Sequence, residues 1–210
     1  MSEKPILFNT DMVQAILDDR KIVTRRVIKP TDKKADHVEP LIDAYTGRFL
    51  KMINCNNERA ALSDIRPPYK KGDYLYVREA WAKDCFDNYV YRADFVGTKI
   101  SPEWKWKPSI HMPKEAARIW LRVINVMVEP LQDITVDGCK AEGIYDDYKT
   151  LSPEYHDMLM EKAYPDTFKK LWNSTIKKQE LDSYGWDSNP WVWVIEFERI
   201  EREVQSGSCE

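Results

Sequence analysis

The stretch Arg20-Lys21-Ile22-Val23-Thr24-Arg25-Arg26 joins an amphipathic helix to a β-strand, and the interpretation of the chain starts from it. On its N-terminal side, a helix is predicted over residues 10–19 because four apolar residues share one helical face: Met12, Val13, Ile16 and Leu17. On its C-terminal side, a run rich in β-branched residues predicts a strand over 22–28. The junction places an amine, a hydroxyl and two guanidinium groups together. Such groups can support nucleophilic chemistry or bind phosphate.

Apolar runs elsewhere predict further strands at 5–8, 74–78, 89–93, 118–128 and 191–200. In the last strand, Trp191, Trp193, Ile195 and Phe197 share one face, while Val192, Val194, Glu196 and Glu198 share the other. Three further helices are predicted. One begins after a cap at Thr135 and ends at Gly143, and the other two cover residues 153–163 and 168–176. Because the helices do not alternate regularly with the strands, the pattern favours a mixed barrel with peripheral helices over a parallel sheet.

The composition limits the class of protein. The chain has 210 residues, of which 43% are hydrophobic and 32% are charged, which is typical of a globular protein. A net charge of −3 argues against a surface covered in positive charge but leaves room for a local basic face. No apolar run is long enough to span a membrane, and the N-terminus lacks a signal-peptide pattern, so a cytoplasmic protein is expected. The cysteines and histidines are scattered, which predicts neither a metal site nor a disulfide framework, and no cofactor is expected.

Several pieces along the chain together resemble the ASCH domain of the PUA-like superfamily. They are Arg20-Lys21-x-x-Thr24, Lys71-Gly72-Asp73-x-Leu75-x-Val77, Leu131-x-Asp133-Ile134-Thr135, Ala141-Glu142-Gly143 and Val194-Ile195-Glu196-Phe197. Three further pieces look like the larger ASCH-type proteins of phages and prophages, whose biochemical function is not settled. These are Val77-Arg78-Glu79-Ala80-Trp81, Trp106-Lys107-Pro108-Ser109-Ile110-His111-Met112-Pro113 and Asn189-Pro190-Trp191-Val192-Trp193-Val194.

The resemblance implies an α+β fold, a PUA-like mixed β-barrel with peripheral helices, in a single domain over residues 1–200. Compared with small members of the family, the chain is about twice as long, which implies insertions near 29–66, 82–115 and 145–187. The first insertion is expected to be an extended loop with a small hairpin near Thr46-Gly47, and residues 201–210 a flexible tail. The insertions could cover or rebuild the cleft of the family and so change its substrate.

The resemblance also implies a function. Family members bind RNA or modified nucleosides, and one small bacterial member is an amidohydrolase that removes the acetyl group of N4-acetylcytidine. That enzyme uses a Lys, a Thr three residues later and a distant Glu, which correspond to Lys21, Thr24 and Glu142. In a regular strand the first two side chains would point to opposite faces. They can converge if Lys21 lies in the turn before the strand, where Asp19 would adopt a left-handed conformation.

In this interpretation Lys21 is a base whose pKa is lowered by burial or by neighbouring arginines, and Thr24 is the nucleophile. Glu142 orients Lys21 or handles a proton. The alternative is an exposed lysine at a helix end and an ordinary strand threonine. Arg25 and Arg26 should lie on opposite faces of their strand, so that one of them can bind phosphate.

A second set of candidate ligand-binding residues combines aromatic and charged side chains: Arg78, Glu79, Trp81, Trp104, Trp106, Lys107 and His111. Aromatic rings interleaved with cations suit stacking on nucleobases. The alternative is a packed insertion over the mouth of the barrel. Glu79 could be a second acid in the site, or it could form a local Arg–Glu pair.

Two functions follow. The first is recognition of RNA or of a modified nucleoside, with hydrolysis of an acyl-amide such as that of N4-acetylcytidine as its enzymatic version. The second is a non-catalytic nucleic-acid-binding adaptor of phage or prophage origin. The environment of Lys21 discriminates between them, because a buried Lys21 near Glu142 favours catalysis and a solvated Lys21 favours binding.

Overall fold

The computed structural model describes residues 2–44, 49–57, 61–98, 104–144 and 153–201, and the side chains of all of these except 153–161. Both Thr46-Gly47, where a hairpin turn was expected, and the expected tail from residue 202 onward lie outside the described residues. None of the described helices is both long and apolar enough to cross a lipid bilayer.

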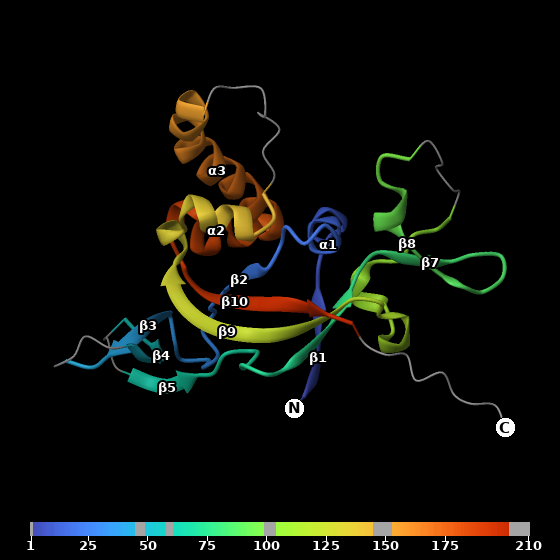
Figure 1. Cartoon of the computed structure of the whole chain (residues 1–210). Coiled ribbons are helices and arrows are strands. Elements are labelled where there is room, and N and C mark those ends of the chain that lie inside the picture. Colours follow the sequence, from blue (N-terminus) through green and yellow to red (C-terminus); the bar gives the residue numbers. More distant parts are fainter. Residues whose placement is uncertain (1, 45–48, 58–60, 99–103, 145–152, 202–210) are drawn as a thin grey trace.

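A five-stranded mixed sheet forms the centre of the fold (Figure 1). Its strands, in spatial order, are β1 (Glu3–Leu7), β6 (Tyr74–Arg78), β9 (Trp120–Pro130), β10 (Trp191–Ile200) and β2 (Val23–Val27). The β1–β6 pair is parallel and the other pairs are antiparallel. Five of the predicted strands therefore share one sheet in an α+β fold, whereas the strand predicted at 89–93 belongs to a separate two-stranded sheet. In the part of the chain that the structure describes, no pairing between β1 and β2 closes this sheet into a barrel.

The alternating faces of β10 separate two hydrophobic clusters, as the sequence predicted. Trp193, Ile195 and Phe197 pack in a cluster that includes side chains of α1 (Thr10–Leu17). Val192 and Val194 pack in a second cluster, to which α2 (Val136–Ala141) and α3 (Pro153–Thr175) contribute. β10 pairs with β9 on one side and β2 on the other, and Val23 of β2 belongs to the second cluster.

Residues 37–65, where an extended loop was expected, instead contain an antiparallel sheet of β3 (His37–Ile42), β4 (Phe49–Cys55) and β5 (Ala61–Ile65). The antiparallel β3–β4 pair, in which Ile42 lies opposite Phe49, agrees with the small hairpin expected there. The extended loop around that hairpin was wrong because the polar composition hid two anchoring side chains. Met52 and Ile65 are buried in the same cluster as the central strands, and burial of such side chains stabilises the sheet. Pro40 lies on the edge strand β3, where proline is tolerated.

Two other predictions are corrected. The helices expected at 153–163 and 168–176 are one helix, α3, which contains Pro165. The helix continues because Tyr164, Phe168 and Trp172 recur at helical spacing and are all buried. The strand expected at 89–93 ends two residues earlier: β8 (Tyr89–Tyr91) pairs with β7 (Trp81–Lys83).

Shorter elements complete the described chain. The helix α4 spans Leu181–Tyr184. Short 3-10 helices lie at Arg92–Phe95, Ser109–His111, Lys114–Ala116, Leu131–Asp133, Lys178–Glu180 and Trp186–Ser188. In Figure 1 the β7–β8 hairpin lies well apart from α2 and α3.

Candidate functional site

The turn after α1 places Lys21 before the start of β2. Asp19 adopts a left-handed conformation, with φ 55°, and the backbone N–H groups of Arg20 and Lys21 both donate to the carbonyl of Ala15, at 2.8 and 2.9 Å. Lys21 then forms an isolated antiparallel bridge with Glu142. The expectation that Lys21 precedes the regular strand is confirmed, so the alternation of strand faces does not separate it from Thr24.

The helix α2 brings Glu142 to this turn. The side chain of Thr135 caps the helix by accepting a hydrogen bond from the Gly138 N–H, at 3.0 Å, and Glu142 follows at the other end. Gly143 then has φ +91°, and a Cβ there would lie only 2.7 Å from the Ala15 Cβ. A glycine is required at this position, because it lets the end of α2 approach the end of α1.

Lys21 is buried, with only 1% of its surface exposed. Its Nζ donates to Glu142 Oε2 at 2.5 Å, to the Glu142 carbonyl at 3.0 Å and to the Val23 carbonyl at 2.7 Å. Three acceptors therefore match the three donors of an ammonium group. Burial lowers the pKa of Lys21 below its ordinary value, and the charges of Arg25 and Arg26 act in the same direction, while Glu142 opposes them. The alternative of an exposed lysine at a helix end is wrong.

Arg25 occupies the other oxygen of Glu142. The Arg25 backbone N–H donates to Glu142 Oε1 at 2.7 Å, and its Nη1 lies 3.2 Å from the same atom. The guanidinium also binds Glu129, with Nε and Nη2 each 2.8 Å from Oε1. Because two carboxylates hold this buried side chain, Arg25 does not have a guanidinium available for phosphate in this structure.

Arg26 lies on the opposite face of β2, as predicted. Its Nη2 donates to the Leu7 carbonyl at 2.9 Å, and its guanidinium lies over the Phe8 ring at 5.3 Å. Among the described residues, no carboxylate forms an ion pair with Arg26. It is therefore the better candidate of the two arginines for an anionic ligand.

Thr24 lines a small pocket between β2 and α3, together with other residues of β2, α1, α2 and α3: Met12, Arg25, Arg26, Glu142, Phe168, Leu171, Trp172 and Thr175. Thr24 is 2% exposed, and its hydroxyl makes no hydrogen bond to a described residue. The cavity volume is about 20 Å³, which is room for about one water molecule. Thr24 and Glu142 both line the pocket, whereas Lys21, which contacts Glu142, does not.

The α3 side chains decide what can reach Thr24. Phe168, Leu171 and Trp172 line the pocket from the helix, and Arg25 lies under the Phe168 ring at 6.0 Å. The sequence suggested that the insertion near 145–187 could cover the cleft, and α3 belongs to it. A nucleobase reaches Thr24 only if these side chains move.

The second set of predicted ligand-binding residues lies around β6, β7 and the segment that follows β8. Glu79 is 1% exposed and binds Arg118 through both oxygens, at 2.9 and 3.0 Å. Burial raises the pKa of Glu79, and Arg118 opposes that shift. Arg78 instead donates from Nε to the Met112 carbonyl, at 2.7 Å. Glu79 thus forms an Arg–Glu pair, but with a distant arginine rather than with its neighbour. Within the described chain, no hydrogen bond or ion pair joins Glu79 to Lys21, Thr24 or Glu142.

Trp81 is buried, which excludes its ring from stacking on a base in this structure. It packs against Tyr89 with ring centroids 5.5 Å apart, and Lys107 Nζ lies 4.6 Å from its ring centroid. Its Nε1 has no hydrogen-bond partner among the described residues. Trp81 is therefore packed within the insertion, whereas Lys107 is exposed.

Trp104 and Trp106 form a partly exposed aromatic cluster with Phe95. Their ring centroids lie 5.1 to 5.9 Å apart. His111 ends a short 3-10 helix and is exposed. Sequence patterns singled out the two tryptophans but missed Phe95, and they also missed the α3 side chains over Thr24.

Comparisons with known proteins add one structural similarity. No family model matches the sequence, and a search of curated proteins finds no match. Among solved structures, the chain is similar to an ASCH domain from Lactobacillus crispatus JV V101, at 11% sequence identity and a TM-score of 0.38. The match covers 94% of this chain and 79% of that one. The similar structure is of the domain type that the sequence resembles. At this identity and TM-score it does not assign a function, so the functional argument rests on the geometry above.

Proposed function

We propose that the chain is a PUA-like ASCH domain, a single decorated domain over residues 1–200, that recognises RNA or a modified nucleoside in the cytoplasm. The observation that supports this most is the buried network of Lys21, Glu142 and Arg25 beside the hydroxyl of Thr24, which makes no hydrogen bond to any residue that the structure describes. Burial of two cations and a carboxylate costs free energy, and perturbed ionisable groups of this kind are enriched at functional sites.

In the enzymatic version of this proposal, Lys21 must first turn from its contacts with Glu142 and Val23 toward Thr24, because it does not line the Thr24 pocket. Neutral Lys21 then takes the proton of the Thr24 hydroxyl, and the oxygen attacks the acyl carbon of the amide. The protonated Lys21 then gives that proton to the leaving nitrogen, which frees the base and leaves an acyl-threonine. Water hydrolyses this ester and releases the acid. The lowered pKa of Lys21 supports its role as the base, and Glu142 orients its amine at 2.5 Å.

The test of this version is release of acetate from N4-acetylcytidine. We expect turnover by the wild-type protein, and its loss in Lys21→Met and Thr24→Val, whose side chains are close in shape to the originals. Thr24→Ser, which keeps a hydroxyl, should retain activity. Absence of acetate from neutral to alkaline pH, with folding confirmed by circular dichroism, rejects this substrate.

The second candidate is a non-catalytic nucleic-acid-binding adaptor of phage or prophage origin. It is favoured by the partly exposed rings of Phe95, Trp104 and Trp106 and by Arg26, which has no acidic partner among the described residues. Rings of this kind can stack on single-stranded bases, and a free guanidinium can bind phosphate.

Titration with labelled single-stranded RNA tests the adaptor. Trp104→Ala or Trp106→Ala should cost about 1–3 kcal/mol of binding free energy. Arg26→Ala should reduce the slope of log affinity against log salt by about 0.7, the value for one phosphate contact. Phe86→Ala is the matched control, because Phe86 is 82% exposed but lies outside the cluster. Equal losses in Phe86→Ala and the tryptophan variants would contradict a specific stacking site.

A further inference from the structure

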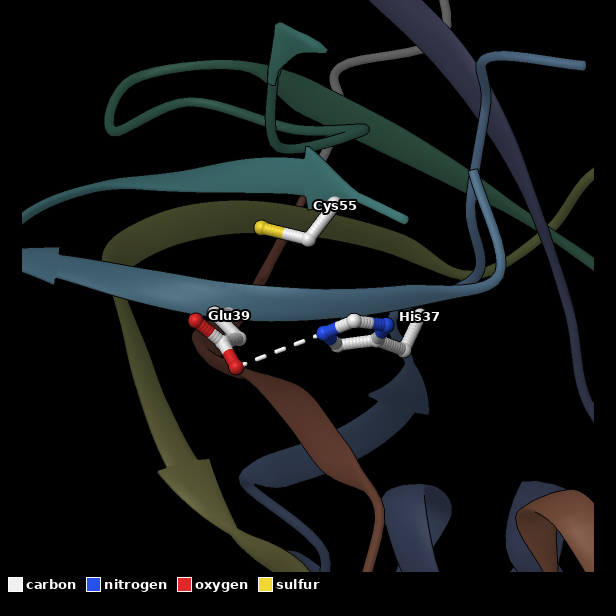
Figure 2. A group of neighbouring side chains, drawn as sticks. All are labelled: His37, Glu39 and Cys55. Atoms are coloured by element: carbon white, nitrogen blue, oxygen red, sulfur yellow. Dashed lines mark hydrogen bonds and ion pairs between the residues drawn. The ribbon is translucent and has the colours of Figure 1, made fainter. Parts of the chain in front are cut away.

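Strand pairing in the three-stranded sheet brings His37, Glu39 and Cys55 together (Figure 2). His37 and Cys55 are register partners in the antiparallel β3–β4 pair, and directly opposite residues point to the same face of a sheet. Glu39 lies two residues after His37 and so shares that face. The scattered spacing of cysteine and histidine predicted no metal site, but that argument could not include residues that only strand pairing brings together.

The distances between the three donor atoms are close to those of a coordinated metal. His37 Nε2 lies 3.3 Å from Glu39 Oε1, and the three donor atoms all lie within 4.8 Å of one another. With zinc–ligand distances of about 2.0–2.3 Å, neighbouring ligands of a tetrahedral site lie roughly 3.3–3.8 Å apart. The imidazole and the carboxylate already meet this spacing. The Cys55 thiol meets it after a shift of about 1 Å at most.

We propose that His37, Glu39 and Cys55 form a zinc-binding site on the face of the β3–β4 pair. A nitrogen, a carboxylate oxygen and a thiolate sulfur form a donor set that suits Zn²⁺, whereas Mg²⁺ and Ca²⁺ prefer oxygen ligands alone. Three protein ligands leave a fourth tetrahedral position for water. The ion would join the first residue of β3 to the last residue of β4 and thereby stabilise their pairing.

The burial of the three residues fits entry of an ion from solvent. The side chains of His37 and Glu39 are 37% and 47% exposed, while Cys55 is buried beside them. Burial, with the negative charge of Glu39, raises the pKa of the Cys55 thiol, so the ion must displace a proton when the thiolate binds. A simple His–Glu ion pair accounts for two of the three side chains but does not involve the sulfur. Coordination of that sulfur is therefore the observable that separates the two explanations.

Cobalt(II) is a suitable probe, because a thiolate-to-cobalt charge-transfer band reports sulfur coordination and the visible d–d bands report tetrahedral geometry. The protein would carry Cys85→Ser and Cys209→Ser, so that Cys85, which is exposed, and Cys209 cannot contribute. We expect one Co²⁺ per chain with both sets of bands, displacement by equimolar Zn²⁺, and a rise in Tm when Zn²⁺ is added.

Variants of the three ligands decide the outcome. His37→Gln and Cys55→Ser should abolish the charge-transfer band, and Glu39→Gln should weaken Co²⁺ binding at least about tenfold, since even outer-shell partners of a metal contribute about 10–100-fold. His111→Gln, at an exposed histidine elsewhere, is the matched control and should bind like the parent. If Cys55→Ser fails to fold, the partly exposed His37→Gln and Glu39→Gln still test the site. Absence of the charge-transfer band, or equal binding by His37→Gln and the parent, would identify an adventitious ion only and overturn the proposal.

Discussion

Substitution of Glu142 should lower the free energy of unfolding more than substitution of Lys21, because each side chain keeps different partners when the other is removed. In Glu142→Gln, the Lys21 ammonium keeps only two carbonyl acceptors and loses its carboxylate. Removing one partner of a buried ion pair costs about 3–5 kcal/mol. In Lys21→Met, the Glu142 carboxylate keeps the N–H and the guanidinium of Arg25. The cost of leaving the carboxylate with fewer hydrogen bonds should be at most about 1–3 kcal/mol.

The free energy of unfolding in urea, followed by tryptophan fluorescence, measures both effects. For Glu142→Gln a loss of about 3–5 kcal/mol corresponds to a fall in Tm of roughly 6–20 °C in a chain of this size. Lys51→Met is the control: the Lys51–Asp64 pair is 2.7 Å long but 44% and 56% exposed, so its removal should cost at most about 1 kcal/mol. A Glu142→Gln loss equal to or smaller than that of Lys21→Met would refute the reasoning.

Three further predictions concern stability. Burial alone would raise the pKa of Asp73, but hydrogen bonds from Lys4 and other groups hold it at about 2. The ionised carboxylate therefore adds up to about 2 kcal/mol to the free energy of unfolding above pH 4, and this contribution is lost as the pH falls towards 2. Asp73→Asn should remove this pH dependence in acid-unfolding curves. Gly143→Ala should lower the free energy of unfolding by about 2–5 kcal/mol, because a Cβ there adds left-handed strain and overpacking. Gly97→Ala is the control: with φ +75° and nothing within 4 Å of the added Cβ, it should cost only about 1–2 kcal/mol in the same thermal melts. Because the pKa of Lys21 is lowered from 10.5, the unfolded chain binds more protons between the native pKa and 10.5; stability should rise with pH in that window, and the rise should be absent in Lys21→Met.

The central sheet could be predicted from the sequence because its strands carry their own signals. The alternation from Trp191 to Glu198 places side chains in two clusters, and the structure has both. The sheet of residues 37–65 could not be predicted in the same way. Its strands are partly exposed, and Met52 and Ile65 are buried in a cluster that includes the central strands, far away in the sequence. Local patterns do not contain that information.

In the candidate site, too, features set by the local backbone were predicted, whereas features set by distant residues were not. The turn at Asp19 and the opposite orientations of Arg25 and Arg26 follow from local backbone rules, and they were predicted. The partner of Lys21 lies 121 positions away, and only the resemblance to a family suggested it. For Trp81 the sequence left open both stacking on a base and packing within an insertion, and in the structure Met112 and Ala116 pack with it in a small core. The side chains that cover Thr24 come from α3, which no spacing near Thr24 could indicate.

The place of β2 in the sheet also governs when the site can form during synthesis. β2 carries Thr24, and among the strands that the structure describes its one partner is β10, near the C-terminal end. Roughly 160 residues must leave the ribosome between the two strands, which takes about 10–30 s at ordinary elongation rates. For that time β2 has no strand to pair with and exposes an unpaired edge, of the kind that chaperones protect. A nascent chain that stops before residue 191 should therefore carry every polar residue of the candidate site and yet lack the strand that holds them in place.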